Sequence, residues 1–266
     1  MRFATTSLGD RVAFDLHGAA EAPGAGAGQA PAALFVQGAA LGRANDPIPT
    51  LTARLLAERG FRAAVHDRVG RGDSAASGPI SVDREIAAIT AVADDLGGPV
   101  ILVGHSSGCA LALMAASKID RLAGLVLWEA PLGQFPGGAE LWWAQVHRQI
   151  IDGALEEAVS TYMVDMPEEW LEEVRRAPAY PDIVLTWIPD GTALATVESK
   201  GSAMFLDEVG VPVLALVGTD TFPGMPEAAE AIARSTPNGI AEKLQGAWHE
   251  WDPAAMADRL AEMLRP

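Results

Sequence analysis

The chain has 266 residues and a formal net charge of -16, because 35 aspartates and glutamates outnumber 19 lysines and arginines. This charge would repel phosphate backbones and anionic lipid surfaces, so we expect neither a nucleic acid nor a membrane as partner. A single cysteine, Cys109, excludes an intrachain disulfide and a cysteine metal cluster, and we expect no metal and no other cofactor. Residues 1–9 are polar and no run of about 18 apolar residues occurs, which favours a cytoplasmic location.

Two short strands are predicted at residues 2–6 and 11–16, and residues 18–32, almost entirely glycine, alanine and proline, are expected to form a surface loop. From residue 33 onward, short apolar strands alternate with amphipathic helices, which is typical of a parallel sheet with helices on both faces. The remaining strands are expected at 33–37, 62–67, 100–103, 124–128, 211–217 and 240–244, and the helices at 49–59, 82–96, 107–118, 226–235 and 252–264. We therefore predict an α/β fold with a mostly parallel sheet of eight strands.

Residues 133–206 interrupt this alternation with helical stretches that carry four of the seven tryptophans. We predict that this segment is a helical cap inserted into a core of residues 1–132 and 207–266. Small-molecule sites are usually concave and mostly apolar, so tryptophans of the cap, Trp142 and Trp143 first among them, are expected to bind substrate. The alternative is that these rings only pack the cap helices together.

The pentapeptide Gly104-His105-Ser106-Ser107-Gly108 matches the pattern G-x-S-x-G, in which a tight turn between strand and helix exposes a serine hydroxyl. An apolar strand precedes the pentapeptide and an apolar helix follows it, as this turn requires. Serine is a weak nucleophile at neutral pH and needs a neighbouring base, for which imidazole is best suited. Of the five histidines, only His249 lies between the last predicted strand and the terminal helix. We therefore predict Ser106 as the nucleophile and His249 as its general base.

These motifs resemble the α/β-hydrolase superfamily along nearly the whole chain. Three further segments carry the resemblance. Residues 34–38 resemble the superfamily's strand before the oxyanion loop, residues 66–74 its glycine-rich turn, and residues 246–249 its catalytic histidine loop. The resemblance implies the α/β-hydrolase fold and a monomeric or homodimeric serine hydrolase that cleaves a small ester or lactone through an acyl-enzyme. Carbon-carbon bond hydrolysis, perhydrolysis and small-molecule binding without turnover are alternatives on the same fold.

The resemblance also implies an oxyanion hole made by two backbone N–H groups, those of Ala39 and Ser107. Gln37 stands where the superfamily often has histidine and is a candidate substrate-binding residue; it either orients the loop by a hydrogen bond or fills space. The charged side chains of the glycine-rich turn, Arg68 and Arg71 among them, are expected to satisfy the backbone of their own turn.

Two carboxylates are candidates for the acid that orients His249. Asp220 follows the predicted strand at 211–217, where most superfamily members carry this acid, but it lies one residue closer to Gly218 than is common. Glu129 follows the strand at 124–128, a position where haloalkane dehalogenases resemble this chain in having a carboxylate. We favour Glu129 because of the short spacing at Asp220, and both residues remain candidates.

Overall fold

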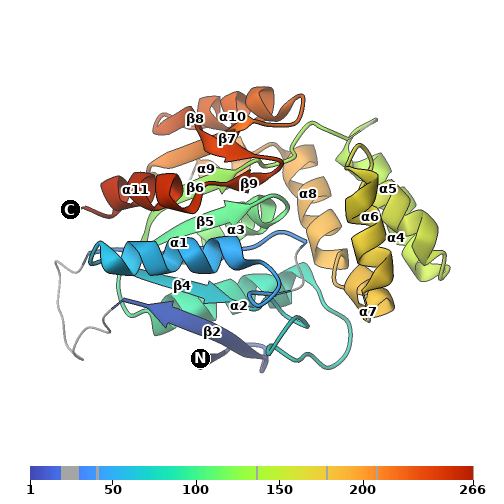
Figure 1. The fold of residues 1–266 in the computed structure, drawn as a ribbon, viewed down its shortest axis with the longest axis horizontal. Coiled ribbons are helices and arrows are strands. Elements are labelled where there is room, and N and C mark those ends of the chain that lie inside the picture. The colour runs from blue at the N-terminus through green and yellow to red at the C-terminus, as the bar shows by residue number, and fades with distance from the viewer. Residues whose placement is uncertain (19–29, 40–41, 136, 178, 208, 266) are drawn as a thin grey trace.

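The computed structural model describes residues 1–18, 30–39, 42–135, 137–177, 179–207 and 209–265. At its centre is a nine-stranded sheet with the order β1-β2-β4-β3-β5-β6-β7-β8-β9 (Figure 1). Its strands are β1 (Arg2–Thr5), β2 (Arg11–His17), β3 (Ala32–Val36), β4 (Arg62–His66), β5 (Val100–His105), β6 (Leu122–Trp128), β7 (Val213–Asp220), β8 (Gly239–Ala247) and β9 (Glu250–Trp251). Most of the loop expected at 18–32 lies outside the described residues.

The sheet is mostly parallel. The pairs from β4 through β3, β5, β6 and β7 to β8 are all parallel, whereas β1 with β2, β2 with β4, and β8 with β9 are antiparallel. The α/β class and the mostly parallel sheet are therefore confirmed. The predicted count of eight strands omitted β9, because a strand of two residues has no periodicity that a sequence pattern can show.

Helices cover both faces of the sheet (Figure 1). Helices α1 (Pro47–Glu58) and α11 (Pro253–Leu264) pack on one face, and α2 (Val82–Asp95), α3 (Gly108–Ala116) and α10 (Met225–Arg234) pack on the other. In β3, Ala33 and Phe35 join the core beneath α1 and α11, whereas Leu34 and Val36 join the opposite core. A strand that is buried on both faces must be apolar at every position, which explains the continuous apolar runs of the sequence.

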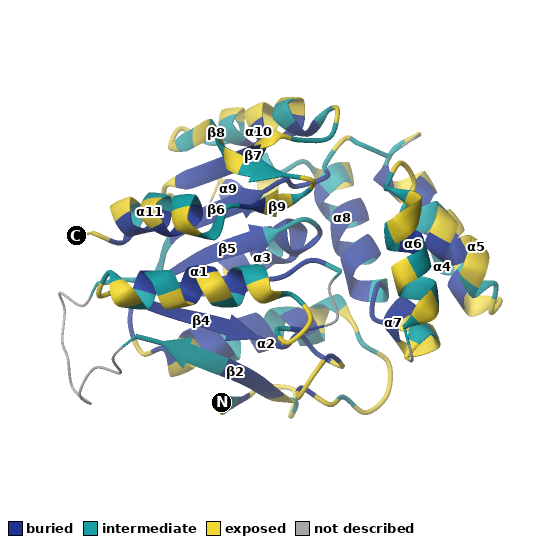
Figure 2. Ribbon diagram, in the orientation of Figure 1, coloured by how far each residue is buried: buried dark blue, intermediate teal, exposed yellow. Residues whose placement is uncertain are grey.

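The segment between β6 and β7 contains only helices where the structure describes it: α4 (Ala139–Ile151), α5 (Leu155–Tyr162), α6 (Glu168–Arg176), α7 (Tyr180–Leu185), α8 (Ile188–Lys200) and α9 (Ala203–Leu206). Helix α8 packs on α2 and α3 as well as on α4, so it lies between the core and the outer helices (Figure 1). Much of α8 is accordingly buried (Figure 2). The boundaries of a separate cap at 133 and 206 remain a prediction. No helix within the described ranges has the length and apolarity needed to cross a lipid bilayer.

The buried His66 should make the stability of this fold depend on pH. Its side chain is fully buried in β4, and Nδ1 donates a hydrogen bond to the carbonyl oxygen of Phe35 at 3.0 Å. Burial, together with the charge of Arg68, lowers the pKa of His66 from 6.5 to about 4. Between pH 6.5 and about pH 4, His66 is therefore mostly protonated in the unfolded chain and mostly neutral in the folded chain.

We expect the free energy of unfolding to fall as the pH drops through this window, by up to about 1.4 kcal/mol per pH unit from this residue alone. Urea unfolding of wild type and of His66→Asn, measured at several pH values, tests this. The amide of asparagine offers a donor to the same carbonyl but does not titrate. The wild type should therefore lose stability more steeply than the variant, and parallel profiles would contradict the assignment.

Candidate active site

Ser106 lies in the turn between β5 and α3, with a backbone φ of 54° that non-glycine residues rarely adopt. The flanking glycines make this turn possible. A Cβ atom on Gly104 would lie 2.7 Å from Cα of Cys109, and one on Gly108 would lie 2.3 Å from the carbonyl oxygen of Val36. Both contacts are too short for real atoms, so the turn requires glycine at each position. The local structure is that of the expected strand-to-helix elbow.

His249 lies in the loop between β8 and β9, with a φ of 72°. Its carbonyl oxygen accepts hydrogen bonds from His105 Nε2 and Trp128 Nε1, each at 3.0 Å. Burial, helped by the neighbouring His249, lowers the pKa of His105 to about 3, so His105 is neutral near pH 7 and donates through Nε2. Two uncharged donors therefore hold the backbone of His249 without adding a positive charge beside its ring.

Glu129 lies directly after β6 and is fully buried. Its Oε2 atom accepts a hydrogen bond from Nδ1 of His249 at 2.7 Å, and Oε1 accepts from the Gly218 backbone N–H at 2.9 Å and the Thr221 hydroxyl at 2.5 Å. Burial favours a higher pKa, but the hydrogen bonds from His249 and Thr221 prevail and hold the pKa of Glu129 below its usual value. The carboxylate thus keeps a proton on Nδ1 and leaves Nε2 as an acceptor. Nε2 is buried and forms no hydrogen bond with any described residue.

Asp220, the other candidate acid, ends β7 with an exposed side chain. No hydrogen bond joins it to His249 in the described part of the chain, and the polar groups on either side of it, Gly218 N–H and the Thr221 hydroxyl, donate to Glu129. The structure thus brings Glu129 to His249 and does not bring Asp220 there.

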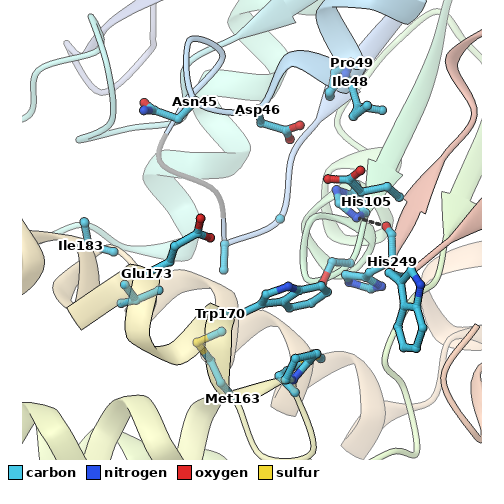
Figure 3. A pocket seen from close by; sticks show the side chains of 18 of the residues that line it. Asn45, Asp46, Ile48, Pro49, His105, Met163, Trp170, Glu173, Ile183 and His249 are labelled. Atoms are coloured by element: carbon cyan, nitrogen blue, oxygen red, sulfur yellow. Dashed lines mark hydrogen bonds between the residues drawn. The ribbon is translucent and has the colours of Figure 1, made fainter. Parts of the chain in front are cut away.

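A cavity of about 840 Å³ has Ser106 and His249 in its wall. Figure 3 shows His249 facing the same space as Asp46 from the core and Trp170 and Glu173 from the cap. The cap contributes mainly apolar and aromatic side chains: Tyr162, Met163, Met166, Trp170, Val174, Ile183 and Trp187. This is the composition expected of a small-molecule site.

Trp142 and Trp143 are not among the residues that line this cavity, which favours the alternative that their rings only pack the cap helices together. The ring of Trp142 stacks on Phe135 with centroids 4.0 Å apart, and its Nε1 donates to the carbonyl oxygen of Thr161 at 2.9 Å. The ring of Trp143 lies so close to Gly191 that a Cβ there would clash with it. Both rings therefore pack the helices of the cap together, and the tryptophans that the cap contributes to the cavity wall are Trp170 and Trp187.

The loop after β3 lies against the elbow: a Cβ on Gly38 would be 2.9 Å from Cβ of Ser106. The carbonyl oxygen of Gly38 accepts hydrogen bonds from Arg68 Nη1 at 2.7 Å and Arg71 Nη1 at 2.6 Å. In a trans peptide, the C=O of one residue and the N–H of the next point in opposite directions. The two arginines therefore orient the peptide that carries the Ala39 N–H so that this donor points away from them.

A buried carboxylate of the cap, Asp190 on α8, connects these arginines to the elbow. Its Oδ1 accepts from the Ser107 hydroxyl at 2.5 Å and from Arg68 Nη1 at 2.6 Å, and its Oδ2 accepts from Arg71 Nη2 at 2.7 Å. Glu85 on α2 also binds Arg68, at 2.9 Å, so two carboxylates balance two guanidinium groups where none is solvated. Arg68 and Arg71, expected to serve only their own turn, instead join the loop after β3 to the cap. No local motif marks Asp190, and sequence reasoning missed it.

Gln37 is 2% exposed and does not line the cavity. Its Nε2 donates to Oδ2 of Asp46 at 3.0 Å, and Asp46 does line the cavity. Of the two roles considered for Gln37, the structure therefore favours orientation by a hydrogen bond over filling space, and it does not place Gln37 in the cavity wall as a substrate-binding residue. Within the described ranges, no three histidine, cysteine, aspartate or glutamate side chains come together in a way that could hold a metal ion.

Comparison with known proteins agrees with this fold. An alpha/beta hydrolase from Sphaerobacter thermophilus superimposes with a TM-score of 0.75 at 25% identity, covering 99% of this chain and 100% of that chain. A thermophilic esterase from Thermogutta terrifontis shares the fold, with a TM-score of 0.63 and 24% identity over 99% and 96% of the two chains.

A sequence match to lipase LipV of Mycobacterium tuberculosis is 42% identical over 66 residues, which is 24% of this chain and 25% of the length of the lipase. The family model described as "Alpha/beta hydrolase family" matches residues 13–263, nearly the whole chain. The expected superfamily resemblance is confirmed, and the protein belongs to the alpha/beta hydrolase family.

Proposed function

We propose that the protein is a serine hydrolase that cleaves a small ester or lactone through an acyl-enzyme intermediate. The observation that carries this proposal is the 2.7 Å hydrogen bond between Glu129 and His249 in the cavity wall that also contains Ser106. A buried carboxylate that fixes the tautomer of a histidine beside a serine is the arrangement that activates a serine hydroxyl. The esterase and the lipase among the similar proteins support the same reaction class.

In this mechanism Oγ of Ser106 attacks the carbonyl carbon of the ester while Nε2 of His249 accepts the hydroxyl proton. Glu129 stabilises the imidazolium, and the N–H groups of Ala39 and Ser107 stabilise the oxyanion of the tetrahedral intermediate. Collapse of the intermediate breaks the bond to the leaving alcohol, which takes the proton from His249. Water then attacks the acyl-enzyme with His249 as base, which releases the acid and restores Ser106.

Ser106→Ala should abolish turnover, with a loss on the order of a millionfold if the serine acts as one unit with its base. Hydrolysis of p-nitrophenyl butyrate and covalent labelling by a fluorophosphonate probe measure this. Wild type should react with both reagents and the variant with neither. Equal labelling of the two proteins would contradict the role of Ser106. A wild type that binds small molecules but hydrolyses no activated ester, lactone or amide would instead favour binding without turnover.

Glu129→Gln should lower kcat by about 10⁴, because the amide can no longer hold the proton on Nδ1 and stabilise the imidazolium. Asp220→Asn is the matched control, since it makes the same chemical change at the other candidate acid and should have little effect. Steady-state kinetics on the same ester compares the two variants. A large loss in Asp220→Asn with an active Glu129→Gln would reverse the assignment of the acid and leave the serine mechanism intact.

Asp190→Asn and Ser107→Ala test whether the buried charge network positions the oxyanion donors. Ser107→Ala keeps the backbone N–H and removes only the hydroxyl that donates to Asp190. Loss of a whole oxyanion donor costs about 10²–10³ in kcat, so a misoriented donor should cost about tenfold, with little change in KM. Ser160→Ala, on an exposed face of α5, is the control for loss of a serine hydroxyl.

A change in stability alone would not alter affinity for a transition-state analogue. In Ser107→Ala and Asp190→Asn, binding of a boronic acid inhibitor should therefore weaken by the same factor as kcat/KM falls. Variants with lowered melting temperature but unchanged kcat and inhibitor affinity would show that the network only stabilises the fold.

A further inference from the structure

The cavity wall carries three carboxylates and, among the lining residues that the structure describes, no lysine or arginine. Asp46 precedes α1 and Glu250 lies in β9, both in the core, whereas Glu173 lies on α6 of the cap. Figure 3 shows Asp46 and Glu173 on different sides of the same space. A ligand between core and cap would therefore meet negative charge from both.

Nearby cations do not neutralise these carboxylates. Asp46 accepts a hydrogen bond from the uncharged amide of Gln37 and forms no ion pair with any described residue, and neither Glu173 nor Glu250 forms one. Arg175, two residues from Glu173, pairs with three other glutamates of the cap: Glu156, Glu168 and Glu172. Burial, with a further contribution from the charge of Glu250, raises the pKa of Asp46. The cavity thus has a negative potential that the protein itself leaves uncompensated.

The rest of the wall suits a cation and a polar acceptor on one ligand. Tyr162 and Trp187 stack with ring centroids 4.4 Å apart, and Trp170 and Trp248 also line the cavity. Aromatic faces attract ammonium groups, most strongly where water is excluded. Trp187 is 2% exposed, and its Nε1 has no hydrogen-bond partner among the described residues. A buried donor needs an acceptor, which a water molecule or a ligand atom in the cavity would supply.

We propose that the cavity selects esters that carry a positively charged ammonium group, prefers them to neutral esters of the same shape, and discriminates against anionic esters. This inference rests on the proposed function, because the charged group binds as part of the substrate that Ser106 attacks. Attraction to Glu173 and Glu250 supplies the preference for charge, and the aromatic wall accepts the apolar surface of the ammonium group.

A pair of isosteric esters tests the proposal. Choline butyrate and 3,3-dimethylbutyl butyrate have the same shape and differ by one positive charge, and the hemisuccinate of 3,3-dimethylbutanol supplies a negative charge. We expect kcat/KM for the choline ester to exceed that of the neutral ester by about tenfold at low ionic strength, with the hemisuccinate slowest. The preference should decline as salt approaches about 1 M, because salt screens the exposed carboxylates of Glu173 and Glu250.

If turnover of these esters is slow, their inhibition constants against p-nitrophenyl butyrate hydrolysis give the same comparison. Equal values for the cationic and neutral compounds, or tighter binding of the anion, would overturn the inference. Hydrolysis of the neutral ester that depends on Ser106 would then still support the proposed function, so the two failures are distinguishable.

Glu173→Gln and Glu250→Gln should each reduce the ratio between cationic and neutral esters, mainly through KM of the cationic ester. Glu169→Gln is the matched control: Glu169 lies on α6 and is exposed, as Glu173 is, but it does not line the cavity, so its loss should leave the ratio unchanged. A ratio that survives in the double variant of Glu173 and Glu250 would show that these carboxylates do not select the substrate.

Discussion

The carboxylate of Glu129 joins the ends of three neighbouring strands, and the geometry of the candidate site depends on it. The residue follows β6, accepts hydrogen bonds from Gly218 in β7 and from Thr221, and binds the ring of His249 beyond β8. Glu129 and His249, like Ser106, have positive φ values, which cost free energy unless the surroundings hold them. The parallel strands place these residues at their carboxyl ends, next to one another, where their hydrogen bonds stabilise the strained backbone.

A second set of buried interactions connects the cap to the carboxyl ends of the parallel strands. Asp190 reaches from α8 to Arg68, Arg71 and Ser107, and the arginines hold the carbonyl of Gly38. Removing one member of such a set would leave a buried charge without its partner, which is far more costly than loss of a surface ion pair. Helix α8 and the loop after β3 are therefore physically connected, and under the proposed mechanism a change on α8 would alter the position of the Ala39 N–H without touching the substrate.

The buried charges of the interior and the charges of the cavity wall differ in how far they are paired. Behind the oxyanion loop, Glu85 and Asp190 match Arg68 and Arg71. The cavity is lined by three carboxylates and by no lysine or arginine among its described residues. The overall charge of -16 has the same sign as the carboxylates of the cavity wall. Long-range attraction would therefore also steer a cationic substrate toward the protein. The fold alone does not specify this preference, because it depends on a few side chains in the cavity wall.

Local patterns in the sequence were sufficient for the fold class, most strand and helix positions, and the elbow at Ser106, because apolar periodicity and glycine spacing act over a few residues. They also reduced the histidines to His249 by chain order. Three findings required the tertiary structure. They are the choice of Glu129 over Asp220 as the partner of His249, the contact from Asp190 to Ser107, and the presence of Trp170 and Trp187, not Trp142 and Trp143, in the cavity wall. Each finding depends on the direction in which a side chain leaves its strand or helix and on which distant element packs opposite it. The spacing of neighbouring residues in the sequence encodes neither this direction nor the packing partner.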